Sequence, residues 1–256
     1  MHKIPAQRRA ELLAILLRRG AASISELAGE IGVSESTVRR DLDELSAGGR
    51  VRRTRGGAVV SGRTAFEPLF ADRSRQNPDE KRRIGRHAVS LLEAGQSVIF
   101  DSSSTVLCAA EAVAEGGPEV TAVTNDVGIA AALASGGGSR VIVTGGEVRE
   151  GSFTLVGPVA REFLGRLHVD VLLLGIHAVV DGSLSEAGIG VAEIKRAMIR
   201  AARRVVLLAD HSKFGDPAFF EVAGVEVVDD LITDRAVPEE ALEALREATS
   251  ARIHLV

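Results

Sequence analysis

The sequence predicts an α/β protein in which a small, mainly helical N-terminal domain precedes a larger domain built on a mostly parallel sheet. Helical patterns fill the first part of the chain, and two short β-like runs joined by glycines follow them. Farther along, apolar strand-like runs alternate with helical patterns, which is typical of a parallel sheet covered by helices on both faces. We therefore expect domains at residues 1–60 and 79–256, joined by a linker with few apolar anchors at residues 61–78.

Three helices open the N-terminal domain. The apolar periodicity predicts them at residues 6–19, at residues 25–31 and from Ser34 to about Ala47. In the first helix, four leucines gather on one face, and Gly20 ends the helix. A tight turn at Gly32 separates the second helix from the third, which Ser34 is expected to cap.

The second and third helices form a helix-turn-helix pattern, whose second helix enters the DNA major groove in the proteins that use it. Val38, Leu42 and Leu45 recur at helical spacing and mark the buried stripe of the third helix. At about 100° per residue, the opposite face carries hydroxyl and guanidinium groups that can bind bases and phosphates. The residues of this segment that we expect to contact DNA are Ser34, Ser36, Thr37, Arg39 and Arg40.

A basic hairpin follows the third helix. Two short β-like runs, Arg50–Thr54 and Ala58–Val60, flank a tip at Gly56 and Gly57. Glycine lets the backbone approach a phosphate and arginine neutralises its charge, so affinity for DNA should fall steeply with salt. The arginines that we assign to this wing contact are Arg52, Arg53 and Arg55. A helix-turn-helix followed by such a wing predicts binding to double-stranded operator DNA.

The charge distribution agrees with a polyanion-binding N-terminal domain. Residues 1–63 carry 12 Lys/Arg and 7 Asp/Glu, a net charge of +5, whereas the remainder carries 19 and 28, a net charge of −9. The single cysteine, Cys108, excludes an intramolecular disulfide, and the histidines lack the spacing of metal ligands. The apolar stretch Leu12–Leu17 is too short to span a bilayer, so we expect a cytoplasmic protein with no membrane partner.

Seven apolar, β-rich runs predict the strands of the larger domain. They lie at Ser97–Phe100, Val120–Val123, Arg140–Val143, Val169–Leu174, Val205–Ala209, Leu231–Thr233 and Arg252–Leu255. Near-continuous apolar runs of this length are typical of strands that are buried on both faces. Because ligands bind at the carboxyl ends of the strands in such sheets, the loops that follow the strands are candidate ligand-binding segments.

Five of these loops carry polar residues or glycines. The loop that begins at Asp101 combines hydroxyls with a helix N-terminus, a pattern that can hold phosphate. The loop at Asp210 adds Lys213, a cation that can hold a phosphate or a carboxylate. The expected effector-binding residues are Asp101, Ser102, Ser103, Ser104, Thr105, Thr124, Asn125, Asp126, Gly145, Gly146, Gly175, His177, Glu186, Lys195, Asp210 and Lys213. No GxGxxG motif follows the first strand, which argues against a dinucleotide, and we predict no cofactor and no metal ion.

Two parts of the chain resemble one known family. The run Ser23–Val60 resembles the DNA-binding domain of the DeoR family of bacterial repressors, with the core motif at Ser34 to Leu42 and the glycine-glycine-alanine at Gly56 to Ala58. The runs that resemble the sensor domain of this family begin at Asp101, Thr124 and Gly145 and continue at Val169–Val179, Glu193–Ile199 and Leu208–Gly215. That sensor domain is similar in fold to sugar-phosphate isomerases.

The resemblance implies an effector that is a phosphorylated sugar or a related intermediate. It also implies that Asp101 to Thr105 hold phosphate and that Lys195 and Lys213 face the ligand. His177 departs from the pattern, because a carboxylate usually stands at this position. The departure removes a partner for sugar hydroxyls and weakens any argument for catalysis.

These features predict a ligand-controlled repressor of carbohydrate-metabolism genes that has no catalytic residue. Paired recognition helices on spaced half-sites imply a homodimer or a homotetramer. The alternative is a sugar-phosphate isomerase with an accessory DNA-binding domain, in which Glu193 or Glu186 would be the general base and Lys195 would stabilise charge. A third hypothesis, a DNA-binding protein without ligand control, leaves the polar loops of the larger domain unexplained.

Overall fold

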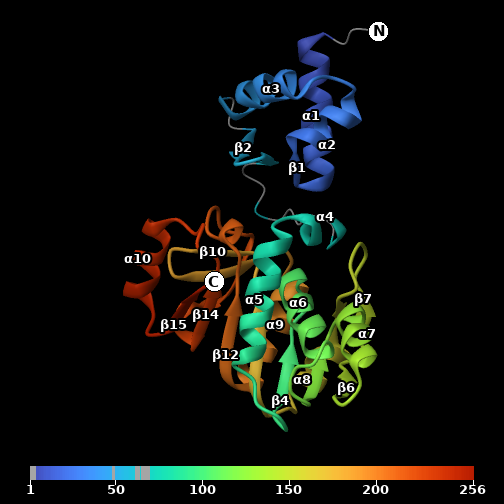
Figure 1. Ribbon diagram of the computed structural model, residues 1–256, viewed down its shortest axis with the longest axis vertical. Helices are drawn as coiled ribbons and strands as arrows, with labels where there is room; N and C mark the ends of the chain where they lie inside the picture. The colour runs from blue at the N-terminus through green and yellow to red at the C-terminus, as the bar shows by residue number, and fades with distance from the viewer. Residues whose placement is uncertain (1–3, 48–49, 61–63, 65–69) are drawn as a thin grey trace. The chain divides into compact units, whose positions relative to one another are not determined.

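The computed structural model describes residues 4–47, 50–60, 64 and 70–256. The chain divides into two compact units between Arg73 and Ser74, and each unit is described by itself (Figure 1). Of the segment expected to be a linker, residues 61–63 and 65–69 lie outside the described residues, and Phe70–Arg75 form helix α4. No helix in the described part of the chain is long and apolar enough to cross a membrane.

The described residues of the N-terminal unit up to Val60 form three helices and a small antiparallel sheet. Its elements are α1 (Pro5–Arg19), β1 (Ala21–Ser23), α2 (Ile24–Ile31), α3 (Glu35–Ala47), β2 (Val51–Thr54) and β3 (Gly57–Val60). The three predicted helices and the hairpin are confirmed, and Ser23 caps α2 through a capping box with Glu26. Leu16, Leu27 and Leu42 are fully buried in the common core of these helices.

Strand β1 was not predicted. The sheet order is β1-β3-β2, so β1 extends the wing hairpin on the side of β3. Its three residues, Ala21–Ser23, carry no β-branched or aromatic side chain that would favour a strand. The strand exists because β3 offers it a backbone partner, which is a tertiary effect that local sequence does not encode.

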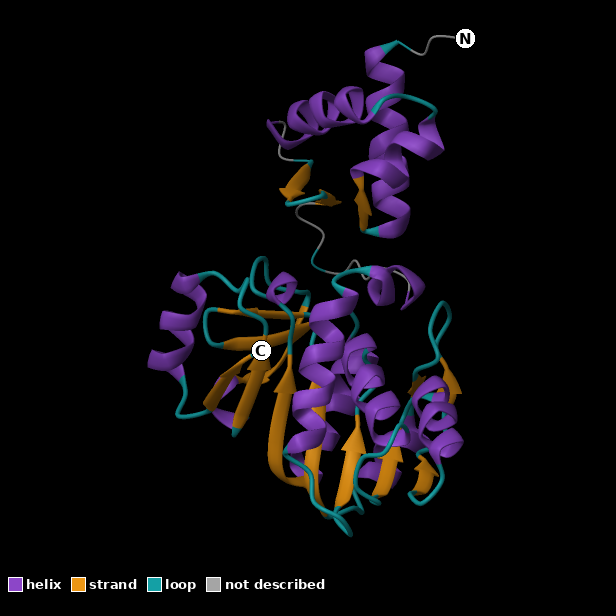
Figure 2. Ribbon diagram, in the orientation of Figure 1, coloured by secondary structure: helices purple, strands orange, loops and turns teal. Residues whose placement is uncertain are grey.

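A seven-stranded parallel sheet forms the centre of the larger unit (Figure 2). Its strands are β4 (Ser97–Phe100), β5 (Thr121–Thr124), β6 (Arg140–Val143), β9 (Val169–Gly175), β12 (Ala202–Leu208), β14 (Asp230–Thr233) and β15 (Arg252–Leu255). Their order across the sheet is β15-β14-β12-β9-β4-β5-β6, and every neighbouring pair is parallel. All seven predicted strand runs are therefore confirmed within a single parallel sheet.

Helices cover both faces of this sheet. One face carries α5 (Pro78–Ser90), α6 (Ser104–Ala114) and α7 (Val127–Gly136), and the other carries α8 (Pro158–Leu164), α9 (Ile189–Ala201) and α10 (Glu239–Ala248). Ile84, Val106 and Ile129 pack in the core of the first face. Leu164 and Met198 pack in the core of the second. Burial on both faces explains why the strands are apolar along their length.

Two small antiparallel sheets complete the unit. One joins β10 (Ala178–Val180), β11 (Ser183–Glu186) and β13 (Phe220–Gly224), and the other is a hairpin of β7 (Glu147–Val148) and β8 (Leu155–Val156). Sequence reasoning missed all five strands, because each has only two to five residues and most mix polar with apolar side chains.

Candidate functional site

Helix α3 presents the polar face that the sequence predicts. Ser36, Arg39 and Arg40 are exposed and Thr37 is half-buried, whereas Val38 is fully buried on the opposite face. The backbone amide of Thr37 donates to the Ser34 hydroxyl at 3.3 Å, which satisfies one of the free amides at the start of the helix. The exposure of this face is confirmed, and its contact with DNA remains a prediction.

The two arginines of α3 are held differently. Arg39 pairs with Glu35 one turn earlier at 3.1 Å, and more than half of each side chain is exposed. No described residue forms a hydrogen bond or an ion pair with the Arg40 guanidinium. The donors of Arg40 are therefore available to a base edge or a phosphate, whereas those of Arg39 must partly leave Glu35 to reach one.

A buried ion pair fixes α3 against α1. Asp41 is 4% exposed and accepts from the Arg8 guanidinium through both carboxylate oxygens, with Nη2 3.0 Å from Oδ1. The hydrogen bond to Asp41 raises the pKa of Arg8 above its ordinary value, so Arg8 stays charged at every physiological pH. The bidentate contact sets the orientation of α3, and a rigid helix loses little entropy when it enters a groove. Sequence reasoning did not single out either residue.

The wing is a two-residue hairpin between β2 and β3. Arg52 and Arg55 are exposed, as a phosphate contact requires. Arg53 is only half-exposed, and its Nε lies 3.4 Å from Asp43 of α3. We therefore expect Arg52 and Arg55 to bind phosphates, while Arg53 also holds the wing against α3.

The structure explains the two wing glycines differently from the expected approach of a phosphate. A β carbon at Gly57 would lie 2.1 Å from the carbonyl oxygen of Ala22, whereas a β carbon at Gly56 would meet nothing within 4 Å. Gly57 is thus required by the close approach of β1 rather than by a phosphate. Only Gly56 lies at an open position where a phosphate could approach the backbone.

Replacing Gly57 with alanine should lower the free energy of unfolding of the N-terminal unit by about 1–3 kcal/mol, because β1 must move away. The matched change Gly56→Ala should cost at most about 0.5 kcal/mol. Urea unfolding of both variants, followed by circular dichroism, measures the difference. Equal stability of the two variants would show that β1 does not pack on Gly57.

The five polar loops of the larger unit follow adjacent strands. In the sheet, β12, β9, β4, β5 and β6 are neighbours in that order and run in one direction, so their carboxyl ends share one edge. We call this the polar edge, made of residues 101–103, 125–126, 144–146, 176–177 and 209–214. The chain thereby gathers groups that are up to 113 positions apart, as expected for a ligand site in a sheet of this kind.

Below the polar edge, three charged side chains form a buried cluster. The Lys195 ammonium pairs with Asp101, donates to the carbonyl of Gly175 at 2.8 Å and lies 3.3 Å from Glu186. Asp101 also accepts from the Gly175 amide at 3.0 Å. Burial lowers the pKa of Lys195, but the two carboxylates outweigh it and raise the pKa above the ordinary value. Lys195 therefore stays charged.

The burial of this cluster changes the role expected for its members. Lys195 is 1% exposed, Glu186 is 4% exposed and Asp101 is fully buried. Lys195 was expected to face the ligand, but its ammonium is surrounded by protein acceptors. We assign the three residues to positioning the loops after β4 and β9, and not to direct contact with an anion.

Asn125 and its neighbours connect three loops. Asn125 is fully buried, and its side-chain oxygen accepts from the Ser102 amide at 3.1 Å while its nitrogen donates to the Leu155 carbonyl at 3.2 Å. The Thr124 hydroxyl accepts from the amide of Asp126 at 3.1 Å, and Asp126 caps α7. These three side chains bind protein groups, so their structure-forming role is established by the hydrogen bonds.

The loop after β4 begins helix α6 in the way a phosphate-binding loop would. Ser103 caps the helix by accepting from the amides of Thr105 and Val106 at 3.1 and 3.3 Å. Ser104 and Thr105 are buried. Gly175 is needed here, because a β carbon at that position would lie 2.2 Å from Ser103. Ser103 itself is only half-buried at the helix N-terminus.

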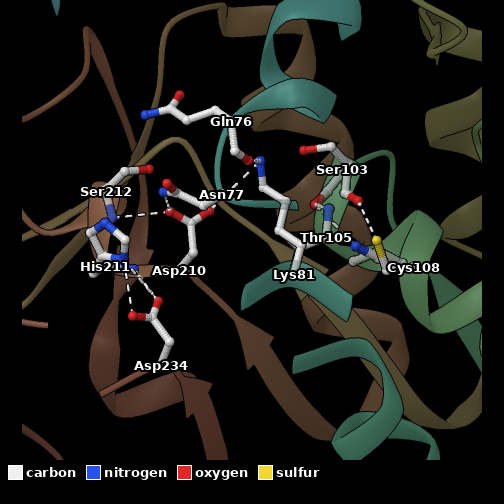
Figure 3. Close-up of polar contacts among 12 residues, drawn as sticks. Gln76, Asn77, Lys81, Ser103, Thr105, Cys108, Asp210, His211, Ser212 and Asp234 are labelled. Carbon is white, nitrogen blue, oxygen red and sulfur yellow. Dashed lines mark hydrogen bonds and ion pairs between the residues drawn. The ribbon is translucent and has the colours of Figure 1, made fainter. Parts of the chain in front are cut away.

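The loop after β12 contains a second buried carboxylate. Asp210 is fully buried and accepts from the Ser212 amide at 3.0 Å and from the Asn77 side chain at 2.8 Å (Figure 3). Burial raises the pKa of Asp210, but Lys213 and Lys81 outweigh it and bring the pKa below the ordinary value. Asp210 is therefore an anion that organises two lysines.

Sequence reasoning missed Lys81. This lysine of α5 is 2% exposed, donates to the carbonyl of Gln76 at 2.5 Å and lies 3.9 Å from Asp210 (Figure 3). It also lies close enough to α6 to lower the pKa of Cys108, although burial raises that pKa overall. The sequence does contain a signal for the burial of Lys81, because this residue lies on the same helical stripe as Ile84, Gly85 and Ala88.

The remaining predicted residues lie on the same edge. Gly145 and Gly146 have φ angles of 73° and 114°, and a β carbon at Gly146 would lie 2.5 Å from the Val156 carbonyl oxygen. His177 follows β9 and is half-buried, and Lys213 is half-buried in a short 3₁₀ helix. The structure thus brings all five predicted loops together, and ligand contact by their residues remains a prediction.

The N-terminal unit is a winged helix-turn-helix with an exposed polar helix. The chain continues into an α/β domain with a polar edge. Together these features define a DNA-binding transcriptional regulator with a sensor domain. Two family models match the chain: the DeoR-like helix-turn-helix domain over residues 8–64 and the DeoR C-terminal sensor domain over residues 76–235. The chain therefore belongs to the DeoR family of transcriptional regulators, and this membership excludes the alternative that it is primarily an isomerase.

Curated relatives agree over nearly the whole length. The HTH-type transcriptional regulator GlpR of Haloferax volcanii is 34% identical over 246 residues, which cover 96% of each chain. The glycerol-3-phosphate regulon repressor of Escherichia coli K12 is 31% identical over 242 residues, covering 94% of this chain and 95% of the relative. Among solved structures, ribose 5-phosphate isomerase A of Methanocaldococcus jannaschii is 17% identical, with a TM-score of 0.41 over 55% of this chain and 56% of the isomerase.

Proposed function

We propose that this protein is a repressor whose operator affinity is controlled by a phosphorylated sugar or a related phosphorylated intermediate. Residues 1–60 would bind the operator, residues 79–256 would bind the effector, and the segment between them would link the two. A regulator of this kind acts on the chromosome, so we propose that it works in the cytoplasm. One relative along nearly the full chain is named the glycerol-3-phosphate regulon repressor. This name supports the proposal that the regulated genes act on phosphorylated carbon compounds.

One observation carries the effector proposal. Lys81 lies 3.9 Å from the buried carboxylate of Asp210, and the backbone amide of Lys213 donates to the carbonyl of Asp210, at an edge that also holds the N-terminus of α6. A phosphate group binds well where an ammonium group and a helix N-terminus meet. At the polar edge the half-buried Lys213 offers the ammonium group, whereas the buried Lys81 holds the loops together through Gln76 and Asp210.

Operator binding would use two copies of α3. Helix-turn-helix proteins bind as dimers to half-sites about 34 Å apart, so we propose a homodimer or a homotetramer. The effector would favour an arrangement with poorer helix spacing. A ligand shifts such an equilibrium only by its differential affinity for the two states, typically about 1–3 kcal/mol, so operator affinity would fall about 5–150-fold.

A titration tests this proposal. The full chain is bound to its own upstream DNA and titrated with a panel of sugar phosphates, glycerol 3-phosphate and inorganic phosphate. We expect one phosphorylated compound to lower operator affinity by about 5–150-fold while inorganic phosphate does not. Tight binding of a compound that leaves operator affinity unchanged would contradict the proposed control.

Lys213→Ala should weaken the response to effector and leave operator affinity without effector unchanged. Lys213 is half-buried beside Asp210, and removing its ammonium takes away a cation that a phosphate needs. The measurement is the effector concentration that half-releases DNA, which should rise about 10-fold or more. Arg166→Ala, which removes an exposed cation from the loop before β9, is the matched control. If Lys213→Ala reduces operator binding to the same degree, its role is structural.

A further inference from the structure

The hairpin of β7 and β8 exposes apolar side chains beside the polar edge. Val148 of β7 is 61% exposed, and Val159 at the start of α8 is 62% exposed. Val159 lies next to the loop that leads into β7, since a β carbon at Gly145 would be 3.5 Å from it. Val127, at the start of α7, is 45% exposed, and its amide donates to the carbonyl of Phe153 in the same hairpin.

The outer edge of β7 also has free backbone groups. Glu147 lies opposite Val156 and Val148 lies opposite Leu155, while the Arg149 amide donates to the Thr154 carbonyl at 2.8 Å. In an antiparallel pair the hydrogen-bonded positions alternate, so the amide and carbonyl of Val148 point away from β8. No strand among the described residues pairs with this edge. A two-stranded hairpin is marginal alone, and such edges are usually covered.

The segment formed by β7 and the residue after it, Arg149, is complementary to itself. When two copies of Glu147-Val148-Arg149 pair antiparallel about Val148, each Glu147 lies opposite an Arg149 of the other copy. Opposite charges at directly paired positions stabilise a sheet, and the arrangement has the two-fold symmetry of a closed dimer. A parallel pairing in register would place like charges opposite each other. The charge pattern therefore favours a second copy of this chain as the occupant.

We propose that the outer edge of β7 is a self-association site, where two copies of the chain pair antiparallel about Val148 and cover it. This inference rests on the homo-oligomer of the proposed function and names the surface that forms it.

The position of the hairpin connects assembly to the effector. The Leu155 amide of β8 donates to the backbone carbonyl of Asn125, and the Asn125 side chain donates to the Leu155 carbonyl at 3.2 Å. Asn125 also holds Ser102 in the loop after β4. A ligand that moves either loop would thus move the paired edge.

Charge exchange at β7 tests the proposal. In the full chain, Glu147→Arg and Arg149→Glu each place like charges opposite each other at both ends of the pairing. Each should raise the dissociation constant of the dimer about 10-fold or more, measured by sedimentation equilibrium. The double exchange, Glu147→Arg with Arg149→Glu, restores both opposite-charge pairs and should return the constant to within about 3-fold of the original. Arg166→Glu, a charge reversal at an exposed arginine away from the hairpin, is the control.

The outcomes separate this proposal from the proposed function. Single exchanges that dissociate the chain, with rescue by the double exchange, support the β7 edge. An oligomer that both single exchanges leave within about 2-fold of the original overturns the β7 edge and leaves the repressor proposal standing. A chain that is monomeric at micromolar concentration and still releases operator DNA with effector overturns the β7 edge and the homo-oligomer but not the effector control.

Discussion

Replacing Arg40 with alanine will weaken binding to the specific operator by about 1–3 kcal/mol, or about 5–150-fold. Arg40 is exposed on the face of α3 that lies opposite Val38, and no described residue competes for its donors. A guanidinium that makes two hydrogen bonds with a guanine edge contributes discrimination of this size. Arg39→Ala should have a smaller effect, because Glu35 already holds that side chain.

The measurement is fluorescence anisotropy with operator DNA and with unrelated DNA of the same length. Loss on the operator alone assigns Arg40 to a base, and equal loss on both assigns it to a phosphate. Arg166→Ala removes one positive charge from the larger unit and controls for net charge. Unchanged operator affinity after Arg40→Ala, with α3 intact by circular dichroism, would contradict the assignment of α3 as the DNA-reading helix.

Replacing Lys195 with methionine will lower the free energy of unfolding of the larger unit by about 3–5 kcal/mol. The change leaves Asp101 and Glu186 buried without their shared cation, and one oxygen of Asp101 already has no hydrogen-bond partner among the described residues. Burying an unpaired carboxylate is far more costly than losing an exposed ion pair. Lys213→Ala should lower the stability less than Lys195→Met does, because the Lys213 side chain is half-buried and Lys81 still faces Asp210.

Urea unfolding followed by circular dichroism compares the two lysine variants. A second variant tests the buried cluster even if Lys195→Met fails to fold. The triple variant Asp101→Asn, Glu186→Gln and Lys195→Met removes all three charges together and should be more stable than Lys195→Met alone. A Lys195→Met protein as stable as Lys213→Ala would contradict the buried cluster.

The main sheet could be predicted from sequence because its central strands are buried on both faces. Runs such as Val169–Leu174 are apolar along their whole length, and helices lie between most of them. The recognition helix could be predicted because its buried stripe at Val38 and Leu42 fixes which residues face away. In both cases the pattern is local and is repeated along the chain.

The missed features depend on partners far along the chain. Lys81 meets Asp210 across 129 positions, and Asp101 meets Lys195 across 94, so no local pattern shows that these charges are buried together. Gly57 is fixed by the backbone of Ala22. The sequence identified the loops of the polar edge, but only tertiary contacts separate the side chains that hold the loops from those open to a ligand.

The two halves of the protein become complete at different moments of synthesis. The core of the N-terminal unit uses only residues 12–58, whereas the polar edge requires Lys195, Asp210 and Lys213 from the last quarter of the chain. N-terminal domains generally fold first as a chain emerges from the ribosome. A premature stop codon before Asp210 would therefore leave a fragment that retains α3 but lacks the loop after β12. Nonsense mutations late in the gene should then produce DNA binding that does not respond to effector, rather than simple loss of the regulator.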